Sequence, residues 1–324
     1  MASIELIKQL RTLTNAGMAD CKSALDESQD DLQKAIDIIK VRGQNISDSR
    51  SAKVAAEGRV AISHGGDLKV AAMVEINCQT DFVANCEAFV NFAEDVAYTL
   101  ADSIVIGTSF QATDVEFDRK ETISATKENV VVRRWWAEEA TNPAVRVFSY
   151  LHSNNKIGVL LTMQAPSEAA AESQEFNDLG SDLAMQICAM NPLGVSADRI
   201  STEEVERQKA IFETQLREDV KPKPEAMWPK IIEGKFKKYY KDVCLLEQES
   251  VLVAKSNVQQ VIDNVSAKLG GAITVINFVR AEVGDGIEVN KNNFAEEVAK
   301  MVAPEEPGGF IKYGDIIPLN GRGI

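Results

Sequence analysis

The sequence predicts an α+β protein in which small antiparallel sheets carry helices. The first observation is the alternation from Leu68 to Ile76, where apolar residues take every second position, as in a half-buried strand. The second is a strand hairpin that occurs twice, over 58–78 and over 145–164, each time around a short polar or glycine-bearing turn. The third is the helical spacing of apolar residues after each hairpin. The two copies share no obvious residue-by-residue identity, so the repeat is one of architecture.

The composition is that of a globular protein with a sizeable core. The 324 residues are 45% hydrophobic and 26% charged, and a chain of this length is expected to divide into two or more units. No apolar run is long enough to span a bilayer, and the N-terminus lacks the layout of a signal peptide. We therefore predict a cytoplasmic protein without a membrane partner. The formal charge of −14 argues against a nucleic-acid grip over the whole surface, and we predict no direct nucleic-acid partner.

The sequence predicts neither a metal site nor a cofactor. The five cysteines form no CxxC pair, and with only two histidines, His64 and His152, no cluster has zinc-ligand spacing. An odd, scattered set of cysteines indicates reduced thiols in a cytosol-like compartment. The chain has no phosphate-binding P-loop, no dinucleotide-binding glycine motif after a strand and no GxSxG motif. No catalytic constellation is therefore predicted.

Residues 1 to 43 are predicted to form three short helices. Apolar residues at helical spacing mark one face of each, and Asn15-Ala16-Gly17 and Gly43 supply the breaks. These faces consist of Leu6, Leu10 and Leu13, then Met18, Cys21 and Leu25, then Leu32, Ala35, Ile36 and Ile39. Small and polar residues follow over 44–57, which predicts a linker.

The strand that passes through Ile76 leads into a strand–helix corner. Thr80 and Asp81 are good helix N-cap residues, and a helical pattern follows them. The corner therefore carries an acid and a phenylalanine, Asp81 and Phe82, where both side chains could project outward. The alternative is that Asp81 only caps the helix and Phe82 is its first core residue, as most large aromatic residues are.

The second half of the chain contains a charged helical hairpin. A strand over 130–139 precedes the second strand hairpin, and the helix after that hairpin ends near Pro192. Helices over 202–218 and 227–239, separated by prolines 222 and 224, predict an antiparallel helical hairpin. Its segment Lys235–Lys241 mixes basic and aromatic residues, which can indicate nucleic-acid binding. The many acids of the first helix favour an intramolecular, salt-bridged hairpin instead.

The C-terminal part is predicted to close the fold. Strands are expected over 243–253 and 272–281 with a helix between them, and Phe294, Val298 and Met301 mark a last helix. The order of the tail 304–324 stays open, since it contains proline and glycine but also several large apolar residues.

Two segments resemble the signatures of one known family. Glu75-Ile-Asn-Cys-Gln-Thr-Asp-Phe-Val-Ala-Asn85 is similar to the signature of elongation factor Ts, the guanine nucleotide exchange factor of elongation factor Tu. The stretch Leu10–Leu25 resembles the ubiquitin-associated-like N-terminal module of that family, with Asn15 where glycine is frequent. The resemblance extends in order over residues 3 to 301.

The resemblance implies an organisation in four parts. They are a ubiquitin-associated-like helical module with its linker (1–50), a core N subdomain (54–140), a core C subdomain (141–286) with an inserted coiled-coil arm (200–241), and a C-terminal helix module with the tail (287–324).

The resemblance also implies a partner and a site. The partner is elongation factor Tu, and the family's Asp-Phe pair enters this GTPase near its Mg²⁺ site. By the motif, Thr80, Asp81, Phe82 and Val83 form this contact, with Phe82 as an apolar wedge and Asp81 disturbing the surroundings of the ion. Exchange of this kind needs no covalent chemistry. His152 is a candidate for a secondary contact, because the family places one near the second strand hairpin. A homodimer, of the factor or of its complex, stays open.

Two other classes of protein compete with this interpretation. A ubiquitin-associated-type adaptor or scaffold protein would need only the N-terminal helices, and it leaves the signature from Thr80 to Val83 unexplained. A hydrolase would use Asp81 with His64, and it predicts turnover of a small substrate without any protein partner.

Overall fold

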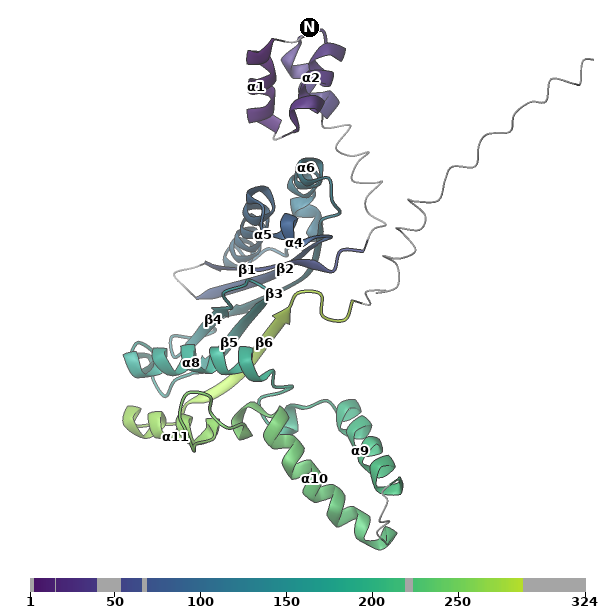
Figure 1. Cartoon of the computed structure of the whole chain (residues 1–324). Helices are drawn as coiled ribbons and strands as arrows, with labels where there is room; N and C mark the ends of the chain where they lie inside the picture. Colours follow the sequence, from purple (N-terminus) through teal and green to yellow (C-terminus); the bar gives the residue numbers. More distant parts are fainter. Residues whose placement is uncertain (1–2, 15, 40–53, 66–68, 219–223, 288–324) are drawn as a thin grey trace, which may run out of the picture. The chain divides into compact units, whose positions relative to one another are not determined.

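The computed structural model describes residues 3–14, 16–39, 54–65, 69–218 and 224–287 (Figure 1). It confirms the α+β class, because the described chain contains two three-stranded antiparallel sheets with helices around them. The chain divides into two units, 1–287 and 288–324, and the description covers the first. Some predictions fall outside the described residues: those for Asn15, Gly43, the linker over 44–53, Pro222, the last helix through Phe294, Val298 and Met301, and the tail 304–324.

The N-terminal residues form three helices around a small apolar cluster of their own. Helices α1 (Ile4–Thr14) and α2 (Met18–Glu27) are followed by a third over residues 32–39. The buried members of the cluster are Ile7, Leu10, Ala16, Cys21, Ala24, Leu25, Ala35 and Ile39. Leu13 and Met18 share helix faces with these residues in the prediction, but they are 60% and 50% exposed, because both lie at helix ends.

The first sheet contains β1 (Glu57–Gly65), β2 (Val70–Cys78) and β3 (Val131–Glu139), in the order β1-β2-β3. The first two strands form the predicted hairpin, with Glu57 opposite Cys78 at one end and His64 opposite Ala71 near the other. Helix α5 (Glu87–Val105) packs on this sheet, and α6 (Glu116–Thr126) packs against α5. Between β2 and α5 lies the four-residue helix α4 (Asp81–Ala84), so the single helix expected after Thr80 is divided in two.

The second sheet repeats this plan. It contains β4 (Val145–Leu151), β5 (Ile157–Gln164) and β6 (Thr274–Glu282), in the order β4-β5-β6. Its hairpin is again followed by a short helix, α7 (Glu168–Ala171), and a long one, α8 (Gln174–Met190). Helix α11 (Val258–Leu269) packs against α8. The predicted repeat of architecture is therefore confirmed.

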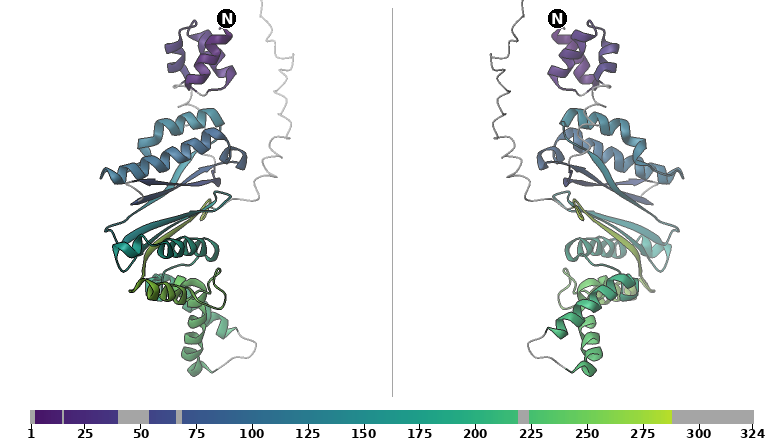
Figure 2. Two further views of the ribbon diagram at one scale, coloured as in Figure 1. Left: turned by 90° about the vertical axis from the view of Figure 1, so that its left-hand side faces the viewer. Right: turned by 90° about the vertical axis from the view of Figure 1, so that its right-hand side faces the viewer.

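The inner faces of the two sheets pack on each other, which gives the core four layers in the order helix, sheet, sheet, helix (Figure 2). The shared cluster includes Val60, Ala71 and Met73 from the first sheet and Val147, Leu160 and Ala281 from the second. Because of this packing, β2 is buried at all nine of its positions. The prediction of a half-buried strand is therefore wrong, since the second sheet covers the face that the alternation assigned to water.

The strand predicted over 243–253 is not found among the described residues. The segment forms a short 3₁₀ helix, η4 (Leu245–Glu247), and a loop. A buried side-chain amide takes the place of a neighbouring strand: Gln186 Oε1 accepts the Val251 N–H at 2.8 Å, and its Nε2 donates to the Glu249 carbonyl at 3.1 Å. The other strand predicted in this part, over 272–281, is β6.

The helical hairpin is joined by aromatic packing. Helices α9 (Thr202–Arg217) and α10 (Trp228–Val243) pack against each other, with the 3₁₀ helix η3 (Glu225–Met227) before α10. Their shared cluster consists of Phe212, Leu216 and Ile232, with Trp228, Ile231, Phe236 and Tyr239 half-buried beside it.

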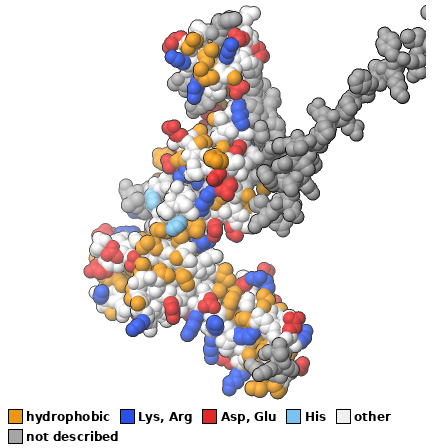
Figure 3. Space-filling view, in the orientation of Figure 1, with side chains coloured by type: hydrophobic (Ala, Val, Ile, Leu, Met, Phe, Trp, Pro, Cys, Tyr) orange, Lys and Arg blue, Asp and Glu red, His pale blue; other side chains and the backbone are white. Residues whose placement is uncertain are grey.

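The prediction of salt bridges between the two helices of the arm is wrong for the described residues. In the described part of the arm, the ion pairs Glu204–Arg207 and Glu233–Lys237 each lie within one helix. The links between the helices are uncharged or mixed: Tyr239 Oη donates to Glu204 Oε1 at 2.8 Å, and Lys235 Nζ donates to Gln215 Oε1 at 2.6 Å. Figure 3 shows acidic and basic side chains intermixed on the visible face of the arm. The helices therefore meet through their apolar stripe, and most of their charges remain in water.

Candidate functional site

The signature lies on a corner that local hydrogen bonds fix tightly. Thr80 has an extended backbone and caps α4, because its Oγ1 accepts the Val83 N–H at 3.3 Å. Asn85 Nδ2 donates to the Asp81 carbonyl at 2.8 Å and closes the other end of this single turn. Cys78 Sγ donates to the Thr80 carbonyl at 3.2 Å. The predicted cap at Thr80 is confirmed, and the turn that carries Asp81 and Phe82 is held at both ends.

The four signature residues divide into an exposed pair and an anchoring pair. The Phe82 side chain is 83% exposed, and Asp81 is exposed next to it. Val83 is half-buried against the apolar core of the first sheet, and Thr80 is half-buried under its own hydrogen bonds. The alternative in which Phe82 begins the core of the helix is therefore wrong. That place belongs to Phe89, which is fully buried.

A carboxylate distant in the sequence completes the corner. Glu128 Oε2 accepts the backbone N–H groups of Gln79 and Thr80, each at 3.0 Å, and its Oε1 accepts the Thr80 hydroxyl at 2.7 Å. Glu128 lies in the short connection between α6 and β3, 48 residues beyond Thr80. Sequence reasoning missed this residue, because no local period or motif links the two positions.

The buried thiol beside the corner is a structural group. Burial raises the pKa of the Cys78 thiol to about 12, and the nearby Glu128 carboxylate adds to this effect. Since the thiolate is the reactive form of cysteine, Cys78 stays protonated and acts as a hydrogen-bond donor.

His152 lies at the end of the core that carries the corner. It follows the last residue of β4 and is half-buried, with Nδ1 3.3 Å from the Tyr150 hydroxyl. The turn that follows reaches the first sheet, because the Asn155 carbonyl accepts the Val60 N–H at 2.7 Å and Lys156 Nζ pairs with Glu57. Glu57 is opposite Cys78 in the hairpin. The turn and the corner therefore lie at the same end of the first sheet.

His64 lies near the end of β1 that is far from Glu57 and from the corner. This distance excludes the pairing of His64 with Asp81 that the hydrolase hypothesis requires. His64 is seven positions from Glu57 along β1, a separation of about 23 Å at the rise of a strand. Its Nε2 is 3.0 Å from Ser149 Oγ, and burial lowers the pKa of its imidazole. The hydrolase hypothesis that combined Asp81 with His64 is therefore wrong.

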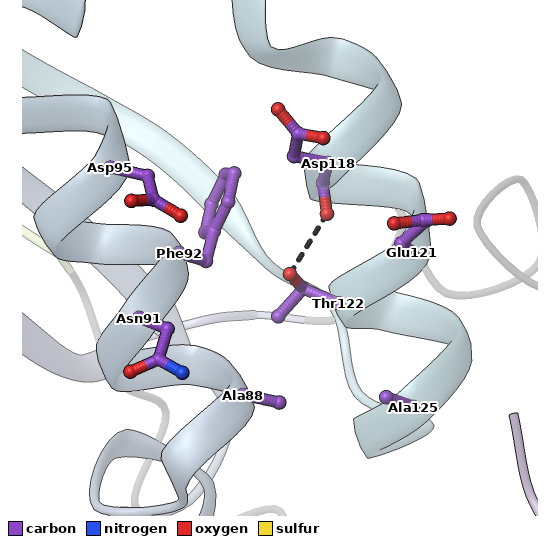
Figure 4. Close-up of a pocket in the computed structure, with 8 residues that line it drawn as sticks. All are labelled: Ala88, Asn91, Phe92, Asp95, Asp118, Glu121, Thr122 and Ala125. Carbon is purple, nitrogen blue, oxygen red and sulfur yellow. Dashed lines mark hydrogen bonds between the residues drawn. The ribbon is translucent and has the colours of Figure 1, made fainter. Parts of the chain in front are cut away.

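An open groove lies between α5 and α6. Figure 4 shows Asp95 and Asn91 on one wall of this groove and Asp118, Glu121 and Thr122 on the other. The groove has a volume of about 250 Å³. Thr122 Oγ1 donates to the Asp118 carbonyl at 2.8 Å within α6. Over the described residues no group of His, Cys, Asp and Glu side chains is arranged to hold a metal ion, and no helix is long and apolar enough to cross a membrane.

Comparison with known proteins places the corner in a family context. The sequence model of the family described as Elongation factor TS matches residues 79–285. Relatives named elongation factor Ts include that of Clostridium botulinum (strain Alaska E43 / Type E3), 38% identical over 316 residues, which cover 93% of this chain and 99% of the relative. That of Nostoc sp. is 36% identical over 310 residues, which cover 93% and 98%. The matched relatives cover 93% of the chain and the family model includes the corner from Thr80 to Val83, so this chain belongs to the elongation factor Ts family.

Proposed function

We propose that this chain binds elongation factor Tu in its GDP-bound state and promotes the replacement of GDP by GTP, acting through Asp81 and Phe82. Family membership makes the chain a translation elongation factor of the exchange-factor class. The observation that carries the choice of site is Phe82, because its ring is 83% exposed on a turn that is fixed at both ends. Phe82 is the most exposed of the large apolar residues in the described part of the chain, and aromatic residues are enriched in the buried centre of protein interfaces.

The chemistry of the exposed pair fits a disturbance of the Mg²⁺ site. A GTPase holds GDP through backbone and lysine contacts to the phosphates and through a Mg²⁺ ion that bridges protein and nucleotide. Phe82 would insert apolar bulk between elements of the GTPase, and Asp81 would alter the hydrogen bonds and charge around the ion. Loss of the ion leaves the phosphate oxygens to repel one another, which speeds the departure of GDP.

This mechanism requires no covalent step. If the chain lowers the affinity of elongation factor Tu for GDP, GDP must lower the affinity for the chain by the same factor. Nucleotide rebinding then releases the exchange factor, which acts again. The chain thus accelerates exchange without making or breaking a covalent bond.

Other parts of the chain supply docking in this proposal. The helices over 4–39 form a ubiquitin-associated-like module whose exposed Ile4, Leu13 and Met18 offer an apolar contact. The turn at His152 offers a secondary contact at the same end as the corner. Two core subdomains (54–140 and 141–286), the arm (200–241) and a C-terminal part (287–324) complete the organisation, and the protein works in the cytoplasm, where translation takes place.

Release of labelled GDP from purified elongation factor Tu tests the proposal. The GDP-loaded GTPase is mixed with excess unlabelled nucleotide, with and without this chain. We expect the chain to increase the release rate in a saturable manner at amounts well below the amount of GTPase. An unchanged release rate at saturating chain would overturn the proposal. The adaptor hypothesis is not favoured, because it uses only residues 4–39, whereas the family match lies over 79–285.

A further inference from the structure

We propose that Glu128 is a positioning residue for nucleotide exchange, which holds the corner so that Asp81 and Phe82 are presented in one orientation. This inference rests on the proposed function. It concerns a residue outside the signature, on a different connection of the fold, and it assigns to that residue a role in exchange without any contact to nucleotide or metal.

The first argument is the number of donors that converge on one carboxylate. Two consecutive backbone N–H groups, of Gln79 and Thr80, and the Thr80 hydroxyl all point at Glu128. The two N–H groups lie beyond the last strand pair, Glu57 with Cys78, and before the first turn of α4. Within the described part of the chain, no backbone carbonyl of a strand or helix accepts either N–H group. An ionised carboxylate suits this place, because it only accepts hydrogen bonds and has room for several donors.

The second argument is the chain of hydrogen bonds through Thr80. A hydroxyl has one proton, and Thr80 gives it to Glu128 Oε1 at 2.7 Å. The lone pairs of the same oxygen are thereby directed away from Glu128, and one of them accepts the Val83 N–H at 3.3 Å. Glu128 therefore sets the hydroxyl in the orientation that caps α4, the turn on which Phe82 lies.

The third argument is that Glu128 is itself held. Lys127 ends α6 in the left-handed conformation, with φ of 61°, and its N–H donates to the Ile123 carbonyl at 2.8 Å. A hydrogen bond also runs from the segment of Glu128 to that of Gln79, since the Asn129 N–H donates to Gln79 Oε1 at 3.2 Å. The segments 79–80 and 128–129 thus hold each other from both sides, and α6 acts as a rigid support for the corner.

The orientation of this turn matters for exchange, because Asp81 and Phe82, the groups proposed to act on the GTPase, lie on a single exposed turn. Phe82 receives no support from a surrounding core, so its direction depends on the backbone of residues 79–83. Without Glu128 the two N–H groups would turn to water, and the turn would sample several directions. Binding to the GTPase would then have to order the turn. This ordering would raise the free energy of the transition state for GDP release.

The test uses Glu128→Ala in the full chain, with labelled GDP release from elongation factor Tu measured over a range of chain concentrations. We expect the maximal rate to fall about tenfold, roughly the value of one charge-assisted hydrogen bond. The concentration for half-maximal effect should change little, since docking uses other surfaces. Glu128→Gln, which keeps the shape and one acceptor, should recover part of the rate. Asp118→Ala, an exposed carboxylate of α6 away from the corner, is the matched control.

A double-mutant comparison separates positioning from general destabilisation. If Glu128 acts through the corner, Glu128→Ala should have little further effect on exchange in a chain that already carries Phe82→Ala. Equal losses in both backgrounds would overturn the proposal. Amide hydrogen exchange supplies a readout without the partner: the N–H groups of Gln79 and Thr80 should lose protection in Glu128→Ala while those of β2 keep theirs.

The outcomes distinguish this inference from the proposed function. A wild-type chain that leaves GDP release unchanged refutes the proposed function, and the hydrogen-exchange arm still reports on the corner. A wild-type chain that accelerates release, with a folded Glu128→Ala variant that is equally active, refutes the positioning role alone.

Discussion

The phenyl ring of Phe82 stays in water in the free chain, although burial of such a ring stabilises a protein by about 1.5–3 kcal/mol. The ring is no part of the apolar cluster around Phe89 and Phe92. We therefore expect Phe82→Ala to change the free energy of unfolding by less than about 0.5 kcal/mol. The same substitution should strongly slow GDP release from elongation factor Tu. Urea unfolding and labelled GDP release measure the two effects.

The control for this prediction is Phe89, which lies near the start of the next helix, α5. Phe89→Ala removes a fully buried ring and should cost about 3–5 kcal/mol of stability. If Phe82→Ala lowered the melting temperature as Phe89→Ala does, and exchange per folded molecule stayed normal, Phe82 would be a packing residue and not a wedge.

Among the described residues, Glu75 is the acidic residue that is fully buried. The contacts around its carboxylate lead to a second prediction. Its carboxylate accepts from Arg133 Nη1 at 2.9 Å, from Arg134 Nε and from the Gly284 N–H at 2.9 Å. Glu75→Gln would leave the Arg133 guanidinium without its anion, and Arg134 would keep only the exposed Asp285 carboxylate, 3.6 Å away. We expect a loss of about 3 kcal/mol, the lower end for a broken buried pair, because both arginines are partly exposed.

Urea unfolding of Glu75→Gln checks this value, with Glu139→Gln as the control, since Glu139 is an exposed acid at the end of the neighbouring strand β3. The control should lie within about 0.5 kcal/mol of the original chain. Equal effects of the two substitutions would mean that the buried ion pairs add nothing to stability.

The sequence could predict the residues of the corner but not their support. Thr80 and Asp81 are recognisable as helix-cap residues, and the strand before them shows its period. The contact with Glu128 joins positions 48 residues apart, and only the packing of α6 against α5, which covers the first sheet, brings them together. A glutamate in a loop has no local feature that distinguishes such a role.

At the scale of elements, alternation and turn residues predicted both hairpins well, while one helix was missed and one segment was wrongly predicted as a strand. Helix α6 has few apolar residues, since its buried positions are Thr122, Ile123 and Ser124, so the 3.6-residue period is weak. The segment 243–253 has the composition of a strand, but Gln186 binds its backbone and prevents sheet pairing. A tertiary hydrogen bond thus overrode local preference.

The N-terminal helices are expected to serve docking more than exchange. They have an apolar cluster of their own, and Leu13 and Met18 remain exposed on them. A chain that begins at Ala52 should keep both sheets and retain the maximal rate of GDP release, with weaker binding to elongation factor Tu. Calorimetric titration measures the affinity, and circular dichroism confirms the fold. Unchanged affinity would remove residues 4–39 from the interface.

The arm is expected to be dispensable for the fold of the core. Its ends are close together, because Gly194 pairs with Cys244 and the Leu193 N–H donates to the Val243 carbonyl at 2.8 Å. A short glycine–serine bridge in place of 202–241 should therefore preserve both sheets, at a modest loop-closure cost. Exchange should persist at a reduced rate, since Asp81 and Phe82 follow β2 of the first sheet, whereas the arm follows α8, which packs on the second sheet. A shortened chain that fails to fold would show that the arm is part of the main core.

At the scale of the whole core, face-to-face packing of the sheets explains why the alternation in β2 was misleading. Ala71 and Met73 fall on the face that alternation assigns to water, yet both are fully buried against the second sheet. A period of two shows which residues share a face of the strand. Whether that face is exposed to solvent depends on what packs against it in the tertiary structure. The same packing places the turn at His152 and the corner at Asp81 at one end of the first sheet. The distance between the two sheets therefore affects how these two surfaces lie relative to each other.

Gly158 on β5 sets this distance and gives the last prediction. A Cβ at this position would lie 2.6 Å from Val60 Cγ1 and 2.7 Å from Met73 Sδ, closer than real atoms approach. Gly158→Ala should therefore push the sheets apart and cost about 1–3 kcal/mol, as overpacked cores do. Val60→Ala removes the nearest methyl group, so the double variant should recover part of this loss, although Val60→Ala alone destabilises. Urea unfolding of the four chains measures the coupling, and strictly additive losses would mean that the sheets do not meet at Gly158.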